Sequence, residues 1–268
     1  MTDFENKTFF ITGATGLLGS ALIKHLQEKN RIIAWTREKG DIREKISIDE
    51  PIDYIVHGAN PTASKYFVDY PVETIRIIYE GTLNTLELAR EKNVKGYLYL
   101  SSLEVYTNIT GVRNCYPEGK RLAECLCTSY FHEYGVNAKI ARLAQVFGPG
   151  IDLENDNRVI AQFMRCARDK KDIVLRTKGD TVRNYCHITD AVSAMLCILA
   201  KGKGGEFYDI ASKNTEISVC DLAKQFGNVV FDIAEDTEKL GYLPTVRIVL
   251  DTAKLESLGW KPGANLKW

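Results

Sequence analysis

A turn punctuated by glycines near the start of the chain limits the possible folds more than any other feature. The apolar run at 8–12 predicts a buried strand, and apolar positions at helical spacing predict a helix over 17–29. Gly13 suits the tight turn between them, Gly16 lets backbone approach a pyrophosphate, and Gly19 lets the helix pack on the sheet. The amides at the start of the helix would face the phosphates. We therefore expect a dinucleotide-binding unit in this part of the chain.

Strand and helix patterns alternate along the remaining sequence. Further strands are predicted at 31–35, 53–57, 95–101, 138–144, 173–176 and 206–210, and further helices at 71–92, 117–134, 158–170 and 190–199. This alternation predicts an α/β fold with a Rossmann-like, doubly wound parallel sheet. We expect a dinucleotide-binding Rossmann domain at 1–145 and a small C-terminal substrate-binding lobe at 146–268.

Composition excludes several classes of protein. The 268 residues, 45% apolar and 26% charged, predict a globular chain that can bury a full core. Lys plus Arg and Asp plus Glu both number 35, so no overall basic field recruits nucleic acid or an anionic membrane. No window reaches the roughly 18 apolar residues of a membrane span, and the first residues lack signal-peptide features. We therefore expect a cytoplasmic protein.

The cysteines predict neither a disulfide framework nor a metal site. There are seven, an odd number, and none of them forms a Cys-x-x-Cys pair. We expect reduced thiols and no bound metal.

Tyr116 and Lys120 form a candidate acid/base pair. They are four residues apart at the predicted start of a helix, and the preceding strand ends near Ser102. That spacing places a phenol and an ammonium on one helix face. Because a neighbouring cation favours the phenolate, we expect Lys120 to lower the pKa of Tyr116 from its usual value of about 10.

Several elements, in the same order as in a known family, carry a resemblance over nearly the whole chain. Besides the Tyr-x-x-x-Lys pair they are Thr12–Gly19 (Thr-Gly-x-x-Gly-x-x-Gly), Tyr54–Asn60 (a strand ending in a variant of His-x-Ala-Ala), Ser101–Tyr106, Ala141–Gly150 and Arg183–Ala191. With them the chain resembles the extended short-chain dehydrogenase/reductase family, in particular its NAD-dependent epimerase/dehydratase group, which acts on nucleotide sugars. The resemblance also implies that a segment near 183–211 returns to the first domain.

The resemblance implies roles for the pair and for the strand that precedes it. Tyr116 would exchange a proton with the substrate, Lys120 would hold the nicotinamide ribose, and Ser102 would hydrogen-bond the substrate oxygen. The cofactor-binding set that it implies is Gly13, Thr15, Gly16, Leu17, Leu18, Gly19, Thr36, Arg37, Asp41, Ile42, His57, Gly58 and Ala59, together with Tyr116 and Lys120.

The end of the second predicted strand indicates which dinucleotide binds. NAD enzymes of this kind place an acidic residue there, whereas this chain has Trp35-Thr36-Arg37. A carboxylate would repel a 2′-phosphate, but a guanidinium and a hydroxyl can bind one. We expect NADP, with NAD as the alternative.

On the substrate side, the resemblance places Arg183 at the nucleotide diphosphate, and Asn157 and Arg158 begin a helix that could cap the same anion. Leu103 replaces the Asp that the 4,6-dehydratases use as general acid, which disfavours dehydration. Glu104 remains and keeps epimerisation or decarboxylation open.

These features predict an NADP(H)-dependent reductase of a nucleotide-activated keto sugar or polyol, in polysaccharide biosynthesis. An NAD-retaining nucleotide-sugar epimerase or decarboxylase is one alternative, since the residues around Tyr116 are closer to UDP-glucuronate decarboxylases. A catalytically silent dinucleotide-sensing regulator is another. The family also implies a homodimer through helices 71–92 and 117–134, although their apolar positions could be core instead: Leu83, Leu86, Leu122, Leu126 and Tyr130.

Overall fold

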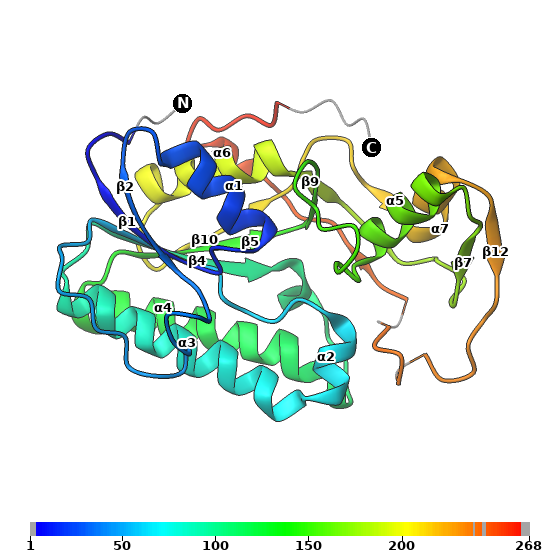
Figure 1. Cartoon of the computed structure of the whole chain (residues 1–268), viewed down its shortest axis with the longest axis horizontal. Coiled ribbons are helices and arrows are strands. Elements are labelled where there is room, and N and C mark those ends of the chain that lie inside the picture. The colour runs from blue at the N-terminus through cyan, green and yellow to red at the C-terminus, as the bar shows by residue number, and fades with distance from the viewer. Residues whose placement is uncertain (1–3, 238, 243–244, 264–268) are drawn as a thin grey trace.

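A six-stranded sheet lies at the centre of the protein (Figure 1). The computed structural model describes residues 4–237, 239–242 and 245–263. The strands pair in the order β10-β5-β4-β3-β1-β2, and every neighbouring pair is parallel. They are β1 (Thr8–Thr12), β2 (Arg31–Trp35), β3 (Tyr54–His57), β4 (Gly96–Ser102), β5 (Ala138–Leu143) and β10 (Phe207–Ile210). The Rossmann-like parallel sheet predicted from the sequence is confirmed.

The strand order reverses between β1 and β3. From β1 the chain moves outward to β2 and then crosses back to β3 on the other side of β1. The connections that leave the carboxyl ends of β1 and β3 therefore diverge. In open α/β sheets this divergence opens the crevice in which ligands bind.

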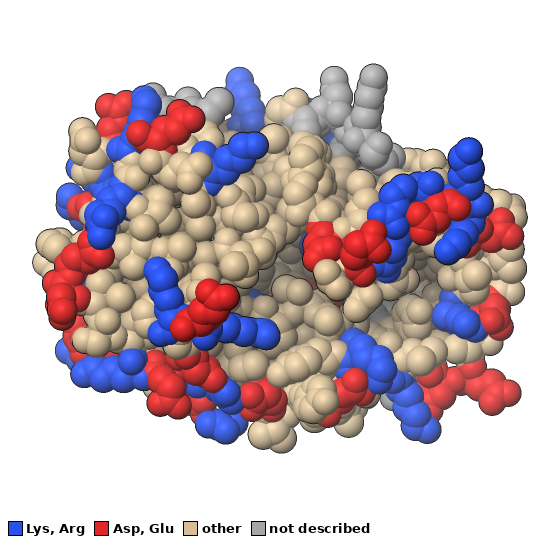
Figure 2. Space-filling view, in the orientation of Figure 1, with Lys and Arg blue, Asp and Glu red and all other residues tan. Residues whose placement is uncertain are grey.

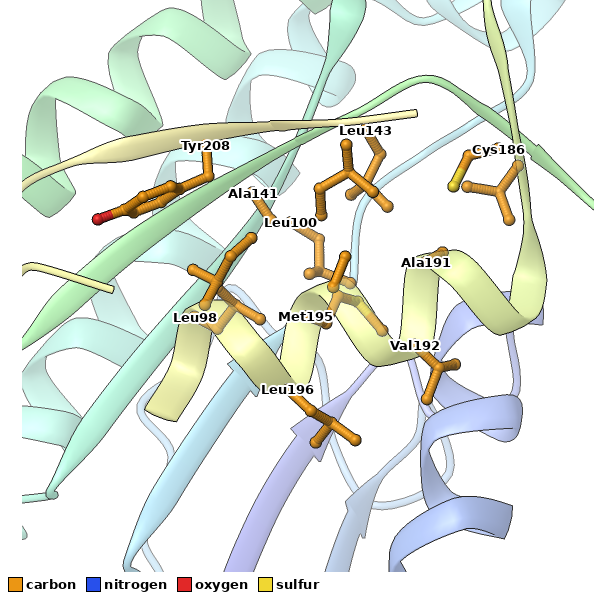
Figure 3. Packing of buried hydrophobic residues seen from close by; sticks show 14 of the residues in the cluster. Leu98, Leu100, Ala141, Leu143, Cys186, Ala191, Val192, Met195, Leu196 and Tyr208 are labelled. Atoms are coloured by element: carbon orange, nitrogen blue, oxygen red, sulfur yellow. The ribbon is translucent and has the colours of Figure 1, made fainter. Parts of the chain in front are cut away.

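Helices cover both faces of the sheet (Figure 1). On one face lie α1 (Leu17–Leu26) and α6 (Ile188–Lys201), and on the other α3 (Pro71–Glu91) and α4 (Cys115–Tyr134). A separate apolar core fills each interface. Figure 3 shows the first, where Met195 and Leu196 of α6 pack with Leu98 and Leu100 of β4.

Shorter elements follow β5 and form a third apolar core around Phe147, Phe163 and Tyr185. Its helices are α5 (Val159–Asp169) and α7 (Val219–Phe226), whereas α8 (Ala253–Glu256) packs against β10 and the first core. The small sheets pair β6 (Gln145–Phe147) with β9 (Tyr185–His187), β7 (Ile173–Leu175) with β12 (Val229–Phe231), and β8 (Val182–Arg183) with both β11 (Ile217–Ser218) and β13 (Arg247–Ile248). The last part of the predicted lobe, 264–268, lies outside the described residues.

All the predicted strands and helices are present, and the differences concern short pieces. Helix α4 begins at Cys115 instead of residue 117. Helix α2 (Ser64–Asp69) and the 3-10 turns η1 (Leu103–Tyr106) and η2 (Val112–Asn114) were not predicted. Neither were α7, α8 and the two- and three-residue strands other than β7. Elements this short do not complete enough periods for hydrophobic spacing to reveal them.

The predicted apolar stripes on α3 and α4 are mainly core. Leu86 is 0% and Tyr130 is 7% exposed, and both pack between the helices and the sheet. For these two residues the alternative that the stripes are core is therefore confirmed. Leu83 and Leu126 are half-buried against the same core, and only Leu122, at 42% exposure, faces outward.

Charges of both signs are interspersed over the face seen in Figure 2, and no single-sign patch dominates it. The same view shows a hollow near the middle of this face. Among the described residues, no helix is both long enough and apolar enough to cross a membrane.

Candidate active site

The turn after β1 is packed so closely that Gly13 and Gly19 cannot carry a side chain. Gly13 has φ +69°, and a Cβ there would lie 2.6 Å from the carbonyl oxygen of Gly58. A Cβ on Gly19 would lie 2.2 Å from the carbonyl oxygen of Gly13. Gly16, the N-cap of α1, offers no side-chain cap, so the first amides of the helix remain available to an anion. The turn therefore fits the pyrophosphate of a dinucleotide.

The flanking residues of this turn differ in exposure. Thr15 and Gly16 are exposed, whereas Leu17 and Leu18 are half-buried and pack against the core beneath α1. The structure thus leaves the tip of the turn open and anchors its helical side.

Thr12 connects the glycine turn to the loop after β3. Its hydroxyl lies 2.7 Å from Nδ1 of His57 and accepts hydrogen bonds from the amides of Gly58 (3.1 Å) and Ala59 (3.2 Å). His57 is fully buried, and burial, followed by the charge of Lys120, lowers its pKa to about 3. His57 is therefore neutral and lies beneath the loop as a support. The sequence analysis missed Thr12, although its position as the last residue of β1 was visible.

The structure brings together the three predicted catalytic residues. Ser102 ends β4, and its hydroxyl hydrogen-bonds Tyr116 and accepts from the amide of Glu104 at 3.2 Å. Nζ of Lys120 lies 5.8 Å from the centroid of the Tyr116 ring and donates to the carbonyl of Leu100 at 2.7 Å. Both Tyr116 (8% exposed) and Lys120 (2% exposed) are buried at the start of α4.

The predicted effect of Lys120 on Tyr116 is wrong. Burial raises the pKa of Tyr116 above its usual value, and the carboxylate of Glu104 raises it further. The hydrogen bond from Ser102 is the largest opposing cause, and the cations that oppose the rise are Arg113 and Arg158. Burial also lowers the pKa of Lys120 to about 7. The helix spacing was right, but the same desolvation disfavours the charged form of both groups.

A buried ion pair that the sequence did not reveal lies beside Tyr116. Arg113 holds Glu104 with two hydrogen bonds of 2.7 and 3.0 Å, and their side chains are 7% and 14% exposed. Nε of Arg113 also donates to the carbonyl of Gly241 at 2.9 Å, and its guanidinium lies 5.6 Å from the centroid of the Phe67 ring. Phe67 in turn stacks on Tyr116, with centroids 4.2 Å apart. Glu104, predicted to contact substrate, is thus already engaged by Arg113.

The side chains predicted to bind the diphosphate differ in whether they already have hydrogen-bond partners. Nε of Arg183, in β8, is buried and has no hydrogen-bond partner among the described residues. Arg158 instead pairs with Asp156 at 2.6 Å and donates to the carbonyl of Val146 at 2.9 Å. Asn157 is exposed, and its carbonyl accepts from Gln162 at 2.6 Å. Of these three residues, only Arg183 has a buried donor without an acceptor among the described residues.

Exposed charges of both signs, Arg37 and Glu38, follow the end of β2. The indole N–H of Trp35 is buried and finds no acceptor among the described residues, and Arg37 is exposed. The nearest predicted carboxylate, Asp41, accepts hydrogen bonds from Arg43, which lower its pKa to about 2.

Other parts of this end of the site are buried or only half exposed. Thr36 is half-buried, and Ile42 is buried in the core, with its carbonyl accepting from Asn84 at 3.0 Å. The side chain of Ile42 therefore adds an apolar surface at this end of the candidate site.

Comparison with known proteins agrees with this geometry. The model of the NAD dependent epimerase/dehydratase family matches residues 9–211. This chain belongs to that family. It is accordingly an enzyme chain of the extended short-chain dehydrogenase/reductase type, an NAD(P)-dependent class. Among the described residues, no cluster of His, Cys, Asp and Glu could hold a metal ion.

Two curated relatives from the family show its range. UDP-glucuronic acid decarboxylase 5 of Arabidopsis thaliana is 28% identical over 98% of this chain and 87% of its own length. The dTDP-D-glucose 4,6-dehydratase of Homo sapiens is 29% identical over 80% of this chain and 65% of its own length.

Solved structures share the fold at lower identity. RMD from Pseudomonas aeruginosa, complexed with NADPH, is 24% identical, with a TM-score of 0.79 over 96% of this chain and 94% of that one. A dTDP-glucose 4,6-dehydratase from Streptomyces venezuelae, with NAD and TYD bound, is 20% identical, with a TM-score of 0.78 over 96% and 92%.

Proposed function

We propose that this chain is an NADP(H)-dependent reductase of a nucleotide-activated keto sugar or polyol. The observation that carries the proposal is the set of groups at the end of β2. The residues there offer the guanidinium of Arg37, the hydroxyl of Thr36 and the unpaired N–H of Trp35, while the nearby Asp41 is bound by Arg43. A guanidinium and a hydroxyl suit a 2′-phosphate, which accepts hydrogen bonds, and in this proposal they outweigh the exposed carboxylate of Glu38 that follows Arg37.

The protonated phenol of Tyr116 fits the role of proton donor in this proposal. Reduction of a carbonyl requires a proton for its oxygen, and a bound NADPH would supply the hydride for its carbon. Because the pKa of Tyr116 is raised, the phenol is protonated at neutral pH and can donate that proton. Ser102, which hydrogen-bonds Tyr116, would hold the same substrate oxygen. A reaction that begins by oxidising an alcohol would instead need Tyr116 as a base.

The substrate would be anchored by its diphosphate. Arg183, with its unpartnered buried Nε, is the group that we expect to bind it. Arg158 is already paired with Asp156, so it would contribute its positive charge. The same charge opposes the rise in the pKa of Tyr116.

A titration with NADPH and with NADH tests the cofactor assignment. We expect tighter binding of NADPH, and we expect Arg37→Glu to reverse the preference because a carboxylate repels the 2′-phosphate. Lys39→Glu, which makes the same charge change at another exposed position, is the matched control and should leave the preference in place. An NADPH/NADH ratio that Arg37→Glu leaves unchanged would refute the assignment.

A second candidate is an NAD-retaining nucleotide-sugar decarboxylase or epimerase. Its support is the similarity to UDP-glucuronic acid decarboxylases over nearly the whole chain. Such an enzyme recycles its dinucleotide, so NAD⁺ should survive purification, and nucleotide sugars should react without added reductant. An initially empty site that prefers NADPH would favour the reductase.

We further propose a cytoplasmic homodimer in polysaccharide biosynthesis. Support for the dimer comes from exposed apolar side chains on α3 and α4: Val72, Ile75, Tyr79 and Leu122. Light scattering at several concentrations measures the mass, and a strictly monomeric protein would contradict this part of the proposal.

A further inference from the structure

A row of polar side chains crosses the central sheet just before the end of β4. Arg142 of β5 is in register with Ser101 of β4 on one side and with Asp209 of β10 on the other. Neighbours in register lie on the same face of a sheet. Here it is the face covered by α4, because Glu124 of that helix pairs with Arg142 at 2.6 Å. Ser101, Glu124 and Asp209 are at most 8% exposed. Burying such groups is costly unless they are paired in a defined arrangement.

Glu124 holds the residue that precedes Ser102. Its carboxylate accepts a hydrogen bond from the hydroxyl of Ser101 at 2.6 Å. It also accepts from Nε and Nη2 of Arg142 at 3.0 and 2.6 Å. A bidentate pair of this kind fixes orientation as well as distance. The end of β4 is therefore tied to α4 and β5 directly before the candidate catalytic serine.

The same guanidinium reaches the far end of η1. Nη1 of Arg142 donates to the hydroxyl of Tyr106, the last residue of η1, at 2.8 Å. That hydroxyl lies 3.0 and 2.9 Å from the two carboxylate oxygens of Asp209, to which it donates. A hydroxyl has one proton to give, so a cation on one side and a carboxylate on the other fix its direction. The turn that follows Ser102 is thus fastened at its end.

The two sets of contacts enclose Ser102 along the chain. Ser101 lies immediately before it, and Tyr106 lies at the end of the turn that follows it. Within that turn the amide of Glu104 donates to the Ser102 hydroxyl at 3.2 Å. A shift at either end would therefore move the hydroxyl that is also bonded to the candidate proton donor.

We propose that Arg142 is a positioning residue, which holds Ser102 from both sides so that its hydroxyl meets the substrate oxygen. Arg142 acts through Glu124 on one side and through Tyr106 on the other. The inference rests on the proposed function only for the role of Ser102, and it is independent of the choice between NADP and NAD. Small displacements of a group that orients the substrate are costly to turnover.

Tyr106→Phe tests the inference without removing a partner of the buried ion pair. It deletes one hydroxyl from a side chain that is 45% exposed, and Arg121 still donates to the two backbone carbonyls that flank this residue. Tyr130→Phe is the matched control, because the Tyr130 hydroxyl also donates to a carboxylate, that of Glu87, but near the C-terminal end of α4. Both variants should fold, with small and similar changes in thermal midpoint.

Hydrogen exchange of the Glu104 amide reports the position of Ser102, because this amide donates to the Ser102 hydroxyl. NMR of the full-length protein without substrate measures the exchange. Tyr106→Phe should speed it about fivefold, as expected for the loss of one hydrogen bond, and Tyr130→Phe should leave it unchanged. Unchanged exchange in Tyr106→Phe would overturn the inference.

A double-mutant cycle shows whether Tyr106 affects turnover through Ser102. The probes are a dTDP-linked 4-keto sugar with NADPH and UDP-glucuronic acid with NAD⁺. With the probe that reacts, Tyr106→Phe should lower kcat about tenfold and leave dinucleotide affinity unchanged, whereas Tyr130→Phe should match the wild type. In a Ser102→Ala background, Tyr106→Phe should have no further effect. The same fall in that background would overturn the inference.

The variants also separate this inference from the proposed function. A fall in kcat in Ser102→Ala but not in Tyr106→Phe would refute the positioning role and keep the role of Ser102. An unchanged kcat in Ser102→Ala would refute the role of Ser102, and the positioning role with it. Failure of both probes to react would count against the proposed function, and the exchange of the Glu104 amide would then decide the inference.

Discussion

The glycine turn at 13–19 and the acid/base segment at 102–120 differ in what fixes them. In the turn, backbone atoms exclude any Cβ, as the 2.6 Å approach to the carbonyl of Gly58 shows, so glycine follows from geometry. In the acid/base segment the protonation of Tyr116 and Lys120 depends instead on burial and on neighbours from other elements. The need for glycine in the turn can therefore be predicted from the sequence. The protonation state of a buried group can be predicted only when its neighbours in the fold are known.

The largest expected effect is a loss of turnover without a loss of dinucleotide binding. Tyr116→Phe removes the proposed proton donor, and turnover should fall about 10²- to 10⁴-fold, the range for loss of a general acid. Dinucleotide affinity, measured by fluorescence titration, should change little because the glycine turn is untouched. Activity that survives the substitution would place the proton donor elsewhere, and a cellular function that survives it would favour the silent sensor.

A substitution that removes one partner of the ion pair between Arg113 and Glu104 tests how burial of these charges affects the free energy of unfolding. Arg113→Met leaves the carboxylate of Glu104 buried and unpaired, which should cost about 3–5 kcal/mol in the free energy of unfolding. The exposed pair of Arg76 with Glu80 is the control, and Arg76→Met should leave the free energy of unfolding nearly unchanged. Denaturant unfolding measures both, and equal costs would mean that the Arg113 pair has no special environment.

Two glycines with nearly the same φ isolate the steric constraint of the turn. Gly13 (φ +69°) faces the Gly58 carbonyl, whereas Gly135 (φ +72°) has nothing within 4 Å of its would-be Cβ. Gly135→Ala should cost about 1 kcal/mol, the conformational term alone. Gly13→Ala should cost clearly more and abolish dinucleotide binding. Similar unfolding midpoints for the two variants would contradict the close packing of the turn.

The last prediction concerns how stability changes with pH. The pKa of Lys120 is lowered to about 7 in the folded protein, whereas in the unfolded chain it is near its usual value of about 10.4. Between these values the unfolded state binds more protons, so Lys120 makes stability rise with pH by at most about 1.4 kcal/mol per unit. Lys120→Met should remove this rise, and denaturant midpoints at pH 7.5, 8.5 and 9.5 measure it. Parallel pH profiles for the two proteins would show that Lys120 is protonated throughout.

The fold and the positions of the acid/base residues could be predicted because their signals are local. The alternation of strands and helices, the glycine spacing and the pair of Tyr116 and Lys120 are each visible within one segment. The pair of Arg113 with Glu104 was missed because its meaning depends on Phe67 and Gly241, which are distant in the sequence. The pKa of Tyr116 was predicted in the wrong direction because burial outweighs the cation, and spacing along a helix carries no information about burial.

Arg113 has a consequence for the cooperativity of the molecule. One guanidinium contacts Glu104 in η1, Ser64 in α2 and the backbone of Gly241 near the end of the chain. Local unfolding that releases Gly241 therefore also alters the charge that faces Tyr116. A change in the segment that carries Gly241 can therefore reach the candidate acid/base group through a single side chain.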